Sequence, residues 1–200
     1  MSRTNAKAVP SGPTAARQKI LNAAYDLFAR AGVQAVGVDS IVLRSGVAKM
    51  TLYRHFPSKK DLALAFLDLR EERWTVEWFK SEIERRTQGP RERLLLVFDL
   101  YHEWFQQPDF EGCSFIKVML ESEPGSPLYD AARAQLKKLG AYVTELALAA
   151  DVADPAALSK TWQILMKGAI VSAYAGNANA ALDAKSAAAV FLNALSKPGV

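Results

Sequence analysis

The chain has 200 residues, half of them hydrophobic, and a formal net charge of +4 at pH 7. This length allows one large domain or two small ones, and the composition can form a buried core. A single cysteine, Cys113, excludes an intrachain disulfide. The N-terminus lacks the apolar run of a signal peptide, and no apolar run approaches the roughly 20 residues of a membrane-spanning helix. We therefore expect a soluble, cytoplasmic protein.

The positive charge is concentrated at the start of the chain. Residues 1–60 contain ten Lys and Arg against two Asp and Glu, a net charge of +8. Residues 61–200 contain fifteen against nineteen, a net charge of −4. This asymmetry indicates an anionic partner for the first part only. Nucleic acid is the leading candidate, and a membrane surface is the weaker one.

Helix signals dominate the chain, and the alternation typical of strands is nearly absent. Residues 1–13 are polar, with two prolines and a glycine, which predicts a disordered arm. Beyond it, apolar positions spaced three or four apart predict an all-α fold of about nine helices. These helices cover residues 15–31, 38–45, 49–56, 58–87, 91–106, 114–122, 126–150, 154–175 and 182–196.

Residues at the expected helix ends support these assignments. Gly32 stands where a left-handed C-terminal cap would fall. Ser58 with Asp61 resembles a capping box, with Asp in the place of Glu or Gln. Proline follows Ser126 and Asp154, and proline is favourable just inside a helix start because that N–H has no partner.

Residues 36–60 predict two short helices joined by a tight turn, in which Gly46 permits a positive φ. Leu52 and Phe56 of the second helix are four apart, so both point inward. This is the pattern of a helix-turn-helix, whose second helix enters the DNA major groove. Gly37 precedes the first helix, where backbone N–H groups and the helix dipole can meet a phosphate.

The same region carries a family pattern. It comprises residues 20–28 (ILNAAYDLF), 32–33, 45–47, 51–56 (TLYRHF) and 58–59. These stretches resemble the tetracycline-repressor (TetR) family of bacterial transcription regulators. The resemblance is specific over about residues 15–65, and elsewhere it rests on the number and length of the helices.

The resemblance implies roles for the residues of the second short helix. The position of Lys49 and those around it read base edges in the family. The positions of Tyr53, His55 and Lys59 hold phosphates. Arg54 is a candidate for either role, and Thr51 for a contact with a base or a thymine methyl.

Two positions depart from the family pattern. Val38 stands where a threonine hydroxyl is usual, so one phosphate contact is in doubt. Met50 stands where glycine is frequent, so the helix offers an apolar contact instead. The full set of predicted DNA-binding residues is Gly37, Val38, Lys49, Met50, Thr51, Tyr53, Arg54, His55 and Lys59.

Aromatic residues gather in the second part of the chain and suggest an apolar pocket between helices. The predicted lining is Phe98, Tyr101, His102, Phe105, Phe115, Met119, Trp162 and Met166, with Trp104 beside them. His102, Glu121 or Tyr174 could supply polar anchors. The alternative is that these side chains only pack a core, as aromatic residues at helical spacing mostly do.

His102 and Cys113 raise the question of a nucleophile and its base. No orienting acid and no glycine-rich turn accompany them, so we expect neither an enzyme nor a cofactor. Two histidines and one cysteine also argue against a metal site. A redox role for Cys113 remains open, although lone cysteines more often act as small buried hydrophobes.

The last two helices carry apolar stripes that predict a four-helix interface between two copies of the chain. The interface residues are expected to be Trp162, Ile170, Tyr174, Val190 and Phe191. The alternative is that both stripes pack only within one subunit.

Together these patterns divide the chain into an arm (1–13), a helix-turn-helix DNA-binding domain (14–60) and a helical regulatory and dimerisation domain (61–200). The expected function is a homodimeric regulator, a repressor in the family's usual mode. It would bind a near-palindromic operator and leave it when a small apolar or aromatic effector binds. The alternative is a DNA-binding dimer without a small-molecule ligand.

Overall fold

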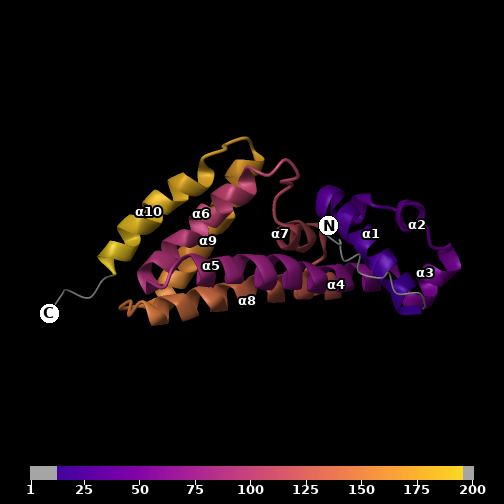
Figure 1. The fold of residues 1–200 in the computed structure, drawn as a ribbon, viewed down its shortest axis with the longest axis horizontal. Helices are drawn as coiled ribbons and strands as arrows, with labels where there is room; N and C mark the ends of the chain where they lie inside the picture. Colours follow the sequence, from indigo (N-terminus) through magenta and orange to yellow (C-terminus); the bar gives the residue numbers. More distant parts are fainter. Residues whose placement is uncertain (1–12, 196–200) are drawn as a thin grey trace, which may run out of the picture. The chain divides into compact units, whose positions relative to one another are not determined.

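The computed structural model describes residues 13–195, whose regular secondary structure is entirely helical (Figure 1). In chain order the elements are α1 (Pro13–Ala35), α2 (Val38–Ser45), α3 (Lys49–His55), α4 (Lys59–Arg70), η1 (Glu71–Lys80), α5 (Ser81–Arg86), α6 (Pro90–Phe105), α7 (Ser114–Glu121), α8 (Pro127–Ala149), α9 (Pro155–Tyr174) and α10 (Ala180–Ala194). The all-α prediction is confirmed. Within this part of the chain, no helix combines the length and hydropathy that a membrane crossing requires.

The predicted helix count also holds, because α4, η1 and α5 follow one another without a gap. Counted as one, they leave nine helical stretches in the described part of the chain. The predicted disordered arm lies outside the described residues, except for Pro13, where α1 begins.

The helix ends follow the predicted local chemistry. Gly46 has a φ of 65°, and its N–H bonds the carbonyl oxygen of Val42 at 3.0 Å. The Ser58 hydroxyl oxygen accepts from the N–H of Asp61 at 3.1 Å. The Asp61 carboxylate accepts from the Ser58 hydroxyl at 2.7 Å, where a full capping box would use a backbone N–H. Gly32 has a φ of 80° and a ψ of 163°, so it breaks α1 in a positive-φ conformation that essentially only glycine adopts, and not in the left-handed helical conformation of a cap.

The chain forms two compact units, Met1–Leu69 and Arg70–Val200, here called the first and second unit. The sequence placed the boundary after residue 60. The first unit extends further because α4 packs on α1. The Phe66 ring meets the rings of Tyr25 and Phe28 edge-on, with centroids 5.7 and 5.5 Å apart.

The continuous helix that the sequence predicted over residues 58–87 contains a π-helical segment, η1. Its hydrogen bonds span five residues, so the turn is wider than in an α-helix. Residues five apart therefore share a face. Trp74 and Phe79 stack there with ring centroids 5.4 Å apart and an angle of 10° between the planes. The wider turn directs Trp74 toward the rings of α6, as described below.

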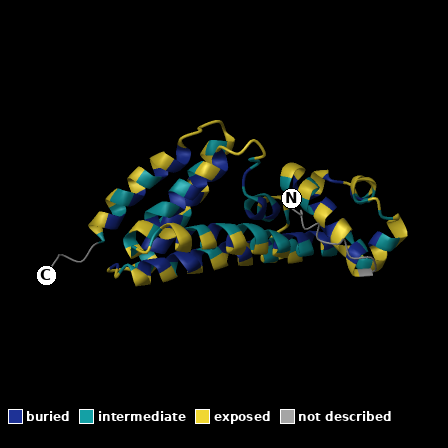
Figure 2. Cartoon of the chain, in the orientation of Figure 1, coloured by how far each residue is buried: buried dark blue, intermediate teal, exposed yellow. Residues whose placement is uncertain are grey.

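The second unit has its core between α6, α8, α9 and α10, whose buried faces appear dark blue in Figure 2. Trp162 of α9 is fully buried, and its indole N–H donates to the carbonyl oxygen of Leu94 at 2.9 Å. Its ring lies 5.8 Å from that of Phe98. α10 packs against both α9 and α6.

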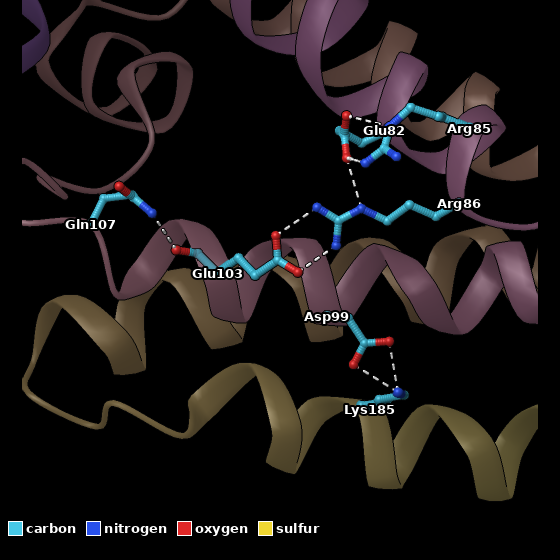
Figure 3. A network of polar contacts seen from close by, with 7 residues as sticks. All are labelled: Glu82, Arg85, Arg86, Asp99, Glu103, Gln107 and Lys185. Atoms are coloured by element: carbon cyan, nitrogen blue, oxygen red, sulfur yellow. Dashed lines mark hydrogen bonds and ion pairs between the residues drawn. The ribbon is translucent and has the colours of Figure 1, made fainter.

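Ion pairs join α6 to its neighbours (Figure 3). Glu82 of α5 binds Arg85 and Arg86, each at 2.7 Å, and Arg86 also pairs with Glu103 of α6. Hydrogen bonds from Arg85 and then Arg86 lower the pKa of Glu82 to about 2. On the other side of α6, Lys185 of α10 binds both oxygens of Asp99 at 2.7 Å. Because these groups are solvent-accessible, each pair adds little to stability.

Candidate functional site

The α3 helix of the first unit buries one side and exposes the other. Leu52 and Phe56 are buried, and the Arg17 guanidinium lies 4.9 Å from the centroid of the Phe56 ring. Lys49 and Met50 are exposed on the opposite side, Met50 at 76%. The buried pair fixes how α3 is rotated about its axis, so the exposed residues form a constant outward face.

The nine predicted DNA-binding residues all lie in or beside α2 and α3 or at the start of α4. None of them is buried in the described structure. Gly37 is exposed and precedes α2 directly, as the sequence predicted. The exposed members are Gly37, Lys49, Met50, Tyr53 and Arg54, and the half-buried ones are Val38, Thr51, His55 and Lys59.

Two lysines of this set are held by contacts within the first unit. The Lys49 ammonium bonds Asp39 of α2 at 2.7 Å, and this hydrogen bond is the main reason why the pKa of Lys49 is raised. Lys59 donates to the carbonyl oxygen of Gln34 at 3.2 Å. These contacts orient the two cations. Neither ammonium group belongs to a buried residue, so each remains accessible to an anion.

Sequence reasoning missed one exposed residue of this surface. Leu43 of α2 is 85% exposed, more than any other large hydrophobic side chain among the described residues. Its neighbour Arg44 pairs with Asp26 of α1 at 2.6 Å. The signal was available in the sequence, because Leu43 does not share the spacing of the buried Ile41 and so falls outside the inward stripe.

The second unit contains a cavity between η1, α6, α7, α8 and α9. Aromatic and aliphatic side chains form most of its wall, together with a few polar and two cationic groups. The lining residues are Arg70, Trp74, Tyr101, Trp104, Cys113, Ser114, Phe115, Ile116, Leu136, Leu139, Gln163, Met166, Lys167 and Ile170.

Only part of the predicted pocket lines this cavity. Tyr101, Phe115 and Met166 are in the wall, and so is Trp104. The other five, Phe98, His102, Phe105, Met119 and Trp162, lie outside it. Phe98 and Trp162 pack on each other in the core instead. Of the alternative polar anchors, His102 lies outside the wall, and Glu121 and Tyr174 are exposed.

The residues that the sequence missed come from positions with no motif of their own. Trp74 enters the wall from the π-helical segment, and Arg70 precedes that segment directly. Gln163 and Lys167 come from α9. The sequence signal for these four residues was weak. Trp74 is the only aromatic residue among them, and nothing in the sequence distinguishes Arg70, Gln163 and Lys167 from other polar residues of the second half.

Cys113 lines the cavity, but its surroundings do not favour a thiolate. Burial raises the pKa of the Cys113 thiol, and the backbone N–H groups of Ile116 and Phe115, with the charges of Arg70 and Lys167, only partly oppose this. A nucleophilic cysteine needs a lowered pKa. Among the described residues, no group of three or more His, Cys, Asp or Glu side chains is arranged to hold a metal ion.

The predicted interface on α9 and α10 has to be revised. Trp162 and Ile170 are 0% and 5% exposed, because they face the core of their own subunit, so a second copy cannot reach them. Tyr174 and Val190 are exposed, and Phe191 is half-buried. The outward faces of the two helices instead carry Ile164, Val171, Tyr174, Leu182 and Val190.

Comparison with known proteins identifies the first unit independently. Residues 20–66 match the family model described as bacterial regulatory proteins, tetR family. The transcriptional regulator QacR of Staphylococcus aureus is 37% identical over 84 residues, 42% of this chain and 44% of QacR. The transcriptional activator FasR of Mycolicibacterium smegmatis is 33% identical over 100 residues, 50% of this chain and 44% of FasR. Each match thus spans less than half of the curated relative.

The comparison of structures extends over nearly the whole chain. The crystal structure of SCO4454, a TetR-family transcriptional regulator from Streptomyces coelicolor, has a TM-score of 0.81 and 25% sequence identity to this chain. The match covers 91% of this chain and 96% of that one. At this coverage the match extends over both units. Residues 20–66 thus match the tetR family of bacterial regulatory proteins, and the chain as a whole is similar in fold to a solved TetR-family regulator.

Proposed function

We propose that the protein is a homodimeric transcriptional regulator that binds a near-palindromic operator through α3. One observation carries the proposal, the exposed cationic and polar face of α3 on a helix whose rotation is fixed by Leu52 and Phe56. Lys49 and Arg54 project from that face and suit base edges or phosphates. Residues 1–60 have a net charge of +8, which favours binding to the DNA backbone.

The base and phosphate contacts are assigned by position. Lys49, Met50 and Thr51 are the first residues of α3. In a recognition helix, the N-terminal residues contact base edges. Tyr53, His55 and Lys59 are proposed to hold phosphates. Gly37 and Val38 present the N-terminus of α2, whose free N–H groups and dipole favour a phosphate.

The second copy is proposed to dock on the outward faces of α9 and α10. Ile164 and Val190 are 71% and 72% exposed, and Val171 and Leu182 extend the apolar area on their helices. Exposed apolar faces of this kind are typical of subunit interfaces. Two copies of two helices would form a four-helix interface with two-fold symmetry. Such a dimer would present two α3 helices to two half-sites.

The cavity of the second unit is the proposed effector site, with repression relieved by a small apolar or aromatic effector. Trp74 in its wall belongs to η1, which continues α4 without a break in the helical backbone. Movement of Trp74 on ligand binding would therefore act on the segment that begins at Lys59. Coupling between two sites in proteins is typically about 1–3 kcal/mol. A regulator of bacterial transcription acts in the cytoplasm, where we place this protein.

The test is binding of the purified protein to DNA flanking its own gene and to a random-sequence pool, at several salt concentrations. We expect enrichment of a near-palindromic sequence and an affinity that falls steeply with salt. The matched variant is Lys160→Gln, at an exposed lysine of α9 in the second unit, which should bind as the wild type does. Equal affinity for every sequence in the pool would refute specific operator recognition.

The alternative function, a DNA-binding dimer without a ligand, makes a different prediction. Its second unit would only dimerise, so no small molecule would raise the thermal unfolding temperature. Under the effector hypothesis, a bound compound stabilises the folded state by mass action. It should also lower the affinity for the selected operator. A compound that does both excludes the alternative.

A further inference from the structure

The cavity has an aromatic wall that suits a flat ligand. Trp74 and Trp104 lie with ring centroids 4.8 Å apart, and Tyr101 is 6.0 Å from Trp74 and 5.6 Å from Trp104. Phe115 of α7 adds a fourth ring to the lining. Aromatic side chains bind planar apolar groups through stacked or edge-to-face contacts. The walls therefore favour an aromatic ring over a flexible chain.

The polar part of the same wall is electropositive. Arg70 and Lys167 both line the cavity, and of the described residues in its wall none is Asp or Glu. Burial raises the pKa of the Cys113 thiol, and this rise is opposed first by the backbone N–H groups of Ile116 and Phe115 and then by the charges of Arg70 and Lys167. Their field thus reaches into the wall. A cationic ligand would be repelled here, and an anionic one attracted.

Two buried polar groups in this wall lack a hydrogen-bond partner. They are the indole N–H of Trp74 and the hydroxyl of Ser114, a residue that is only 4% exposed. An indole N–H can only donate, so its missing partner is an acceptor. Ser114 is also the first residue of α7, and the first three residues of that helix line the cavity. The positive end of the helix dipole favours an acceptor with negative charge.

We propose that the effector is a planar aromatic carboxylate, with its ring against Trp74 and Trp104 and its carboxylate accepting hydrogen bonds from Trp74 Nε1 and Ser114 Oγ. This inference rests on the proposed function, because it assigns a chemical class to the effector of that site. Arg70 and Lys167 neutralise the carboxylate charge. The aromatic walls contact the ring.

The test uses benzoate, 2-naphthoate and biphenyl-4-carboxylate, each beside its own neutral carboxamide, with binding to the full chain measured by titration calorimetry. The two members of a pair have the same ring and nearly the same shape. We expect at least one carboxylate to bind about tenfold more tightly than its carboxamide, since hydrogen bonds to charged groups are stronger. Equal or tighter binding of the carboxamides would overturn the proposal. So would the failure of all three carboxylates to bind.

Two variants locate the site. Ser114→Ala and Lys167→Gln should each reduce the preference for carboxylate over carboxamide several-fold. Lys160→Gln removes an exposed lysine from the same helix, α9, outside the cavity wall, and should leave that preference unchanged. A preference that survives in Lys167→Gln, or that is lost equally in Lys160→Gln, would contradict the assignment. Lys167 is exposed, so this variant tests the idea even if the buried Ser114→Ala variant unfolds.

Operator binding separates this inference from the proposed function. A carboxylate that binds with the expected dependence on Lys167 but leaves operator affinity unchanged supports the ligand class and refutes release by effector. An uncharged compound that enters the cavity and releases the operator does the reverse. That result would support release of the operator by an effector and contradict the proposal that the effector is a carboxylate.

Discussion

The two units of this protein place their chemically distinctive side chains in opposite environments. In the first unit, Lys49, Met50 and Arg54 stand exposed on a short helix whose other side is buried. In the second unit, Trp74 and Ser114 surround a cavity, and their polar atoms are buried without a hydrogen-bond partner. A surface of the first kind suits a large rigid anion that needs no change of shape. The unpaired polar atoms of the second kind can be satisfied only by a ligand small enough to enter the cavity.

The same contrast holds for charge. Residues 1–60 contain ten cations, and the proposed partner of this part is a polyanion, which is bound through many individually weak contacts. The cavity has two cations in its wall, Arg70 and Lys167, beside aromatic side chains. A charge at such a site interacts more strongly than one on an open surface. Substitutions should therefore act differently in the two units, and the following experiments test that difference in order of expected effect.

The largest effect is expected from Trp162→Ala. The side chain is fully buried and its N–H donates to the carbonyl oxygen of Leu94, so truncation leaves a cavity and removes that hydrogen bond. We expect a loss of about 3–5 kcal/mol in the free energy of unfolding, measured with urea. Met50→Ala, at an exposed position of α3, should change it by less than about 0.5 kcal/mol. Similar losses of unfolding free energy in the two variants would contradict the contrast between the buried Trp162 and the exposed Met50.

The next effect concerns the proposed interface. Val171→Asp combined with Val190→Asp places two charges on the outward faces of α9 and α10, where both residues are exposed in one subunit. We expect monomers in sedimentation experiments with unchanged helix content, because burial of an unpaired charge opposes association. Lys160→Asp with Asn193→Asp adds charge to the same two helices at polar positions as a control. A dimer that persists in the Val variant places the interface elsewhere.

Lys49→Ala should alter the sequence preference of DNA binding. If Lys49 reads a base edge, its removal costs about 1–3 kcal/mol on the preferred operator and less on sequences changed at that base. The comparison is made with every single-base variant of the selected operator. Asp39→Ala serves as a control, because it removes the partner of the 2.7 Å contact and leaves the Lys49 ammonium in place. A uniform loss on all sequences would reassign Lys49 to a phosphate.

Lys59→Ala and Tyr53→Phe should instead weaken binding to all sequences alike. Each removes one proposed phosphate contact, and the loss of Lys59 should lower the slope of log affinity against log salt by about one. Lys60→Ala removes the neighbouring exposed cation and shows how much of this effect is net charge alone. Loss of affinity at one base position only would contradict the phosphate role.

The smallest effect is the contribution of Glu82 to stability. Its pKa is lowered to about 2 by Arg85 and Arg86, below its value of about 4.3 in an unfolded chain. Its contribution is therefore present above about pH 4.3 and is lost as the pH falls toward 2. The difference in unfolding midpoint between wild type and Glu82→Gln should shrink over that range and in high salt. Glu145→Gln, an exposed carboxylate of α8, is the matched control. A difference that is independent of pH would exclude the ion pair as its cause.

Much of the first unit could be predicted from the sequence because its determinants are local. Gly46 dictates the turn, Ser58 with Asp61 starts α4, and the spacing of Leu52 and Phe56 sets the inward side of α3. The nine predicted DNA-binding positions are all accessible in the described structure for the same reason. Their roles toward DNA stay predictions.

The second unit was predicted less completely because its determinants are not local. The sequence showed that α9 is a helix with many apolar residues, and Asp154 caps it by accepting from the N–H of Ala157 at 2.9 Å. Almost every side of α9 is apolar, so periodicity could not show which side faces the core. Packing against α6 and α10 decided that Trp162 and Ile170 point inward.

The sequence by itself therefore determined where the helices begin and end, and which short helix presents cations outward, since turns, caps and spacing act over a few residues. Only the tertiary structure decided the cavity wall, because residues from Arg70 to Ile170, on six helical elements and a loop, supply it. It also decided that η1 is a π-helix, which brings Trp74 and Phe79 onto one face. Packing between helices that are distant in the chain determines which side chains are in contact, and local sequence patterns do not predict those contacts.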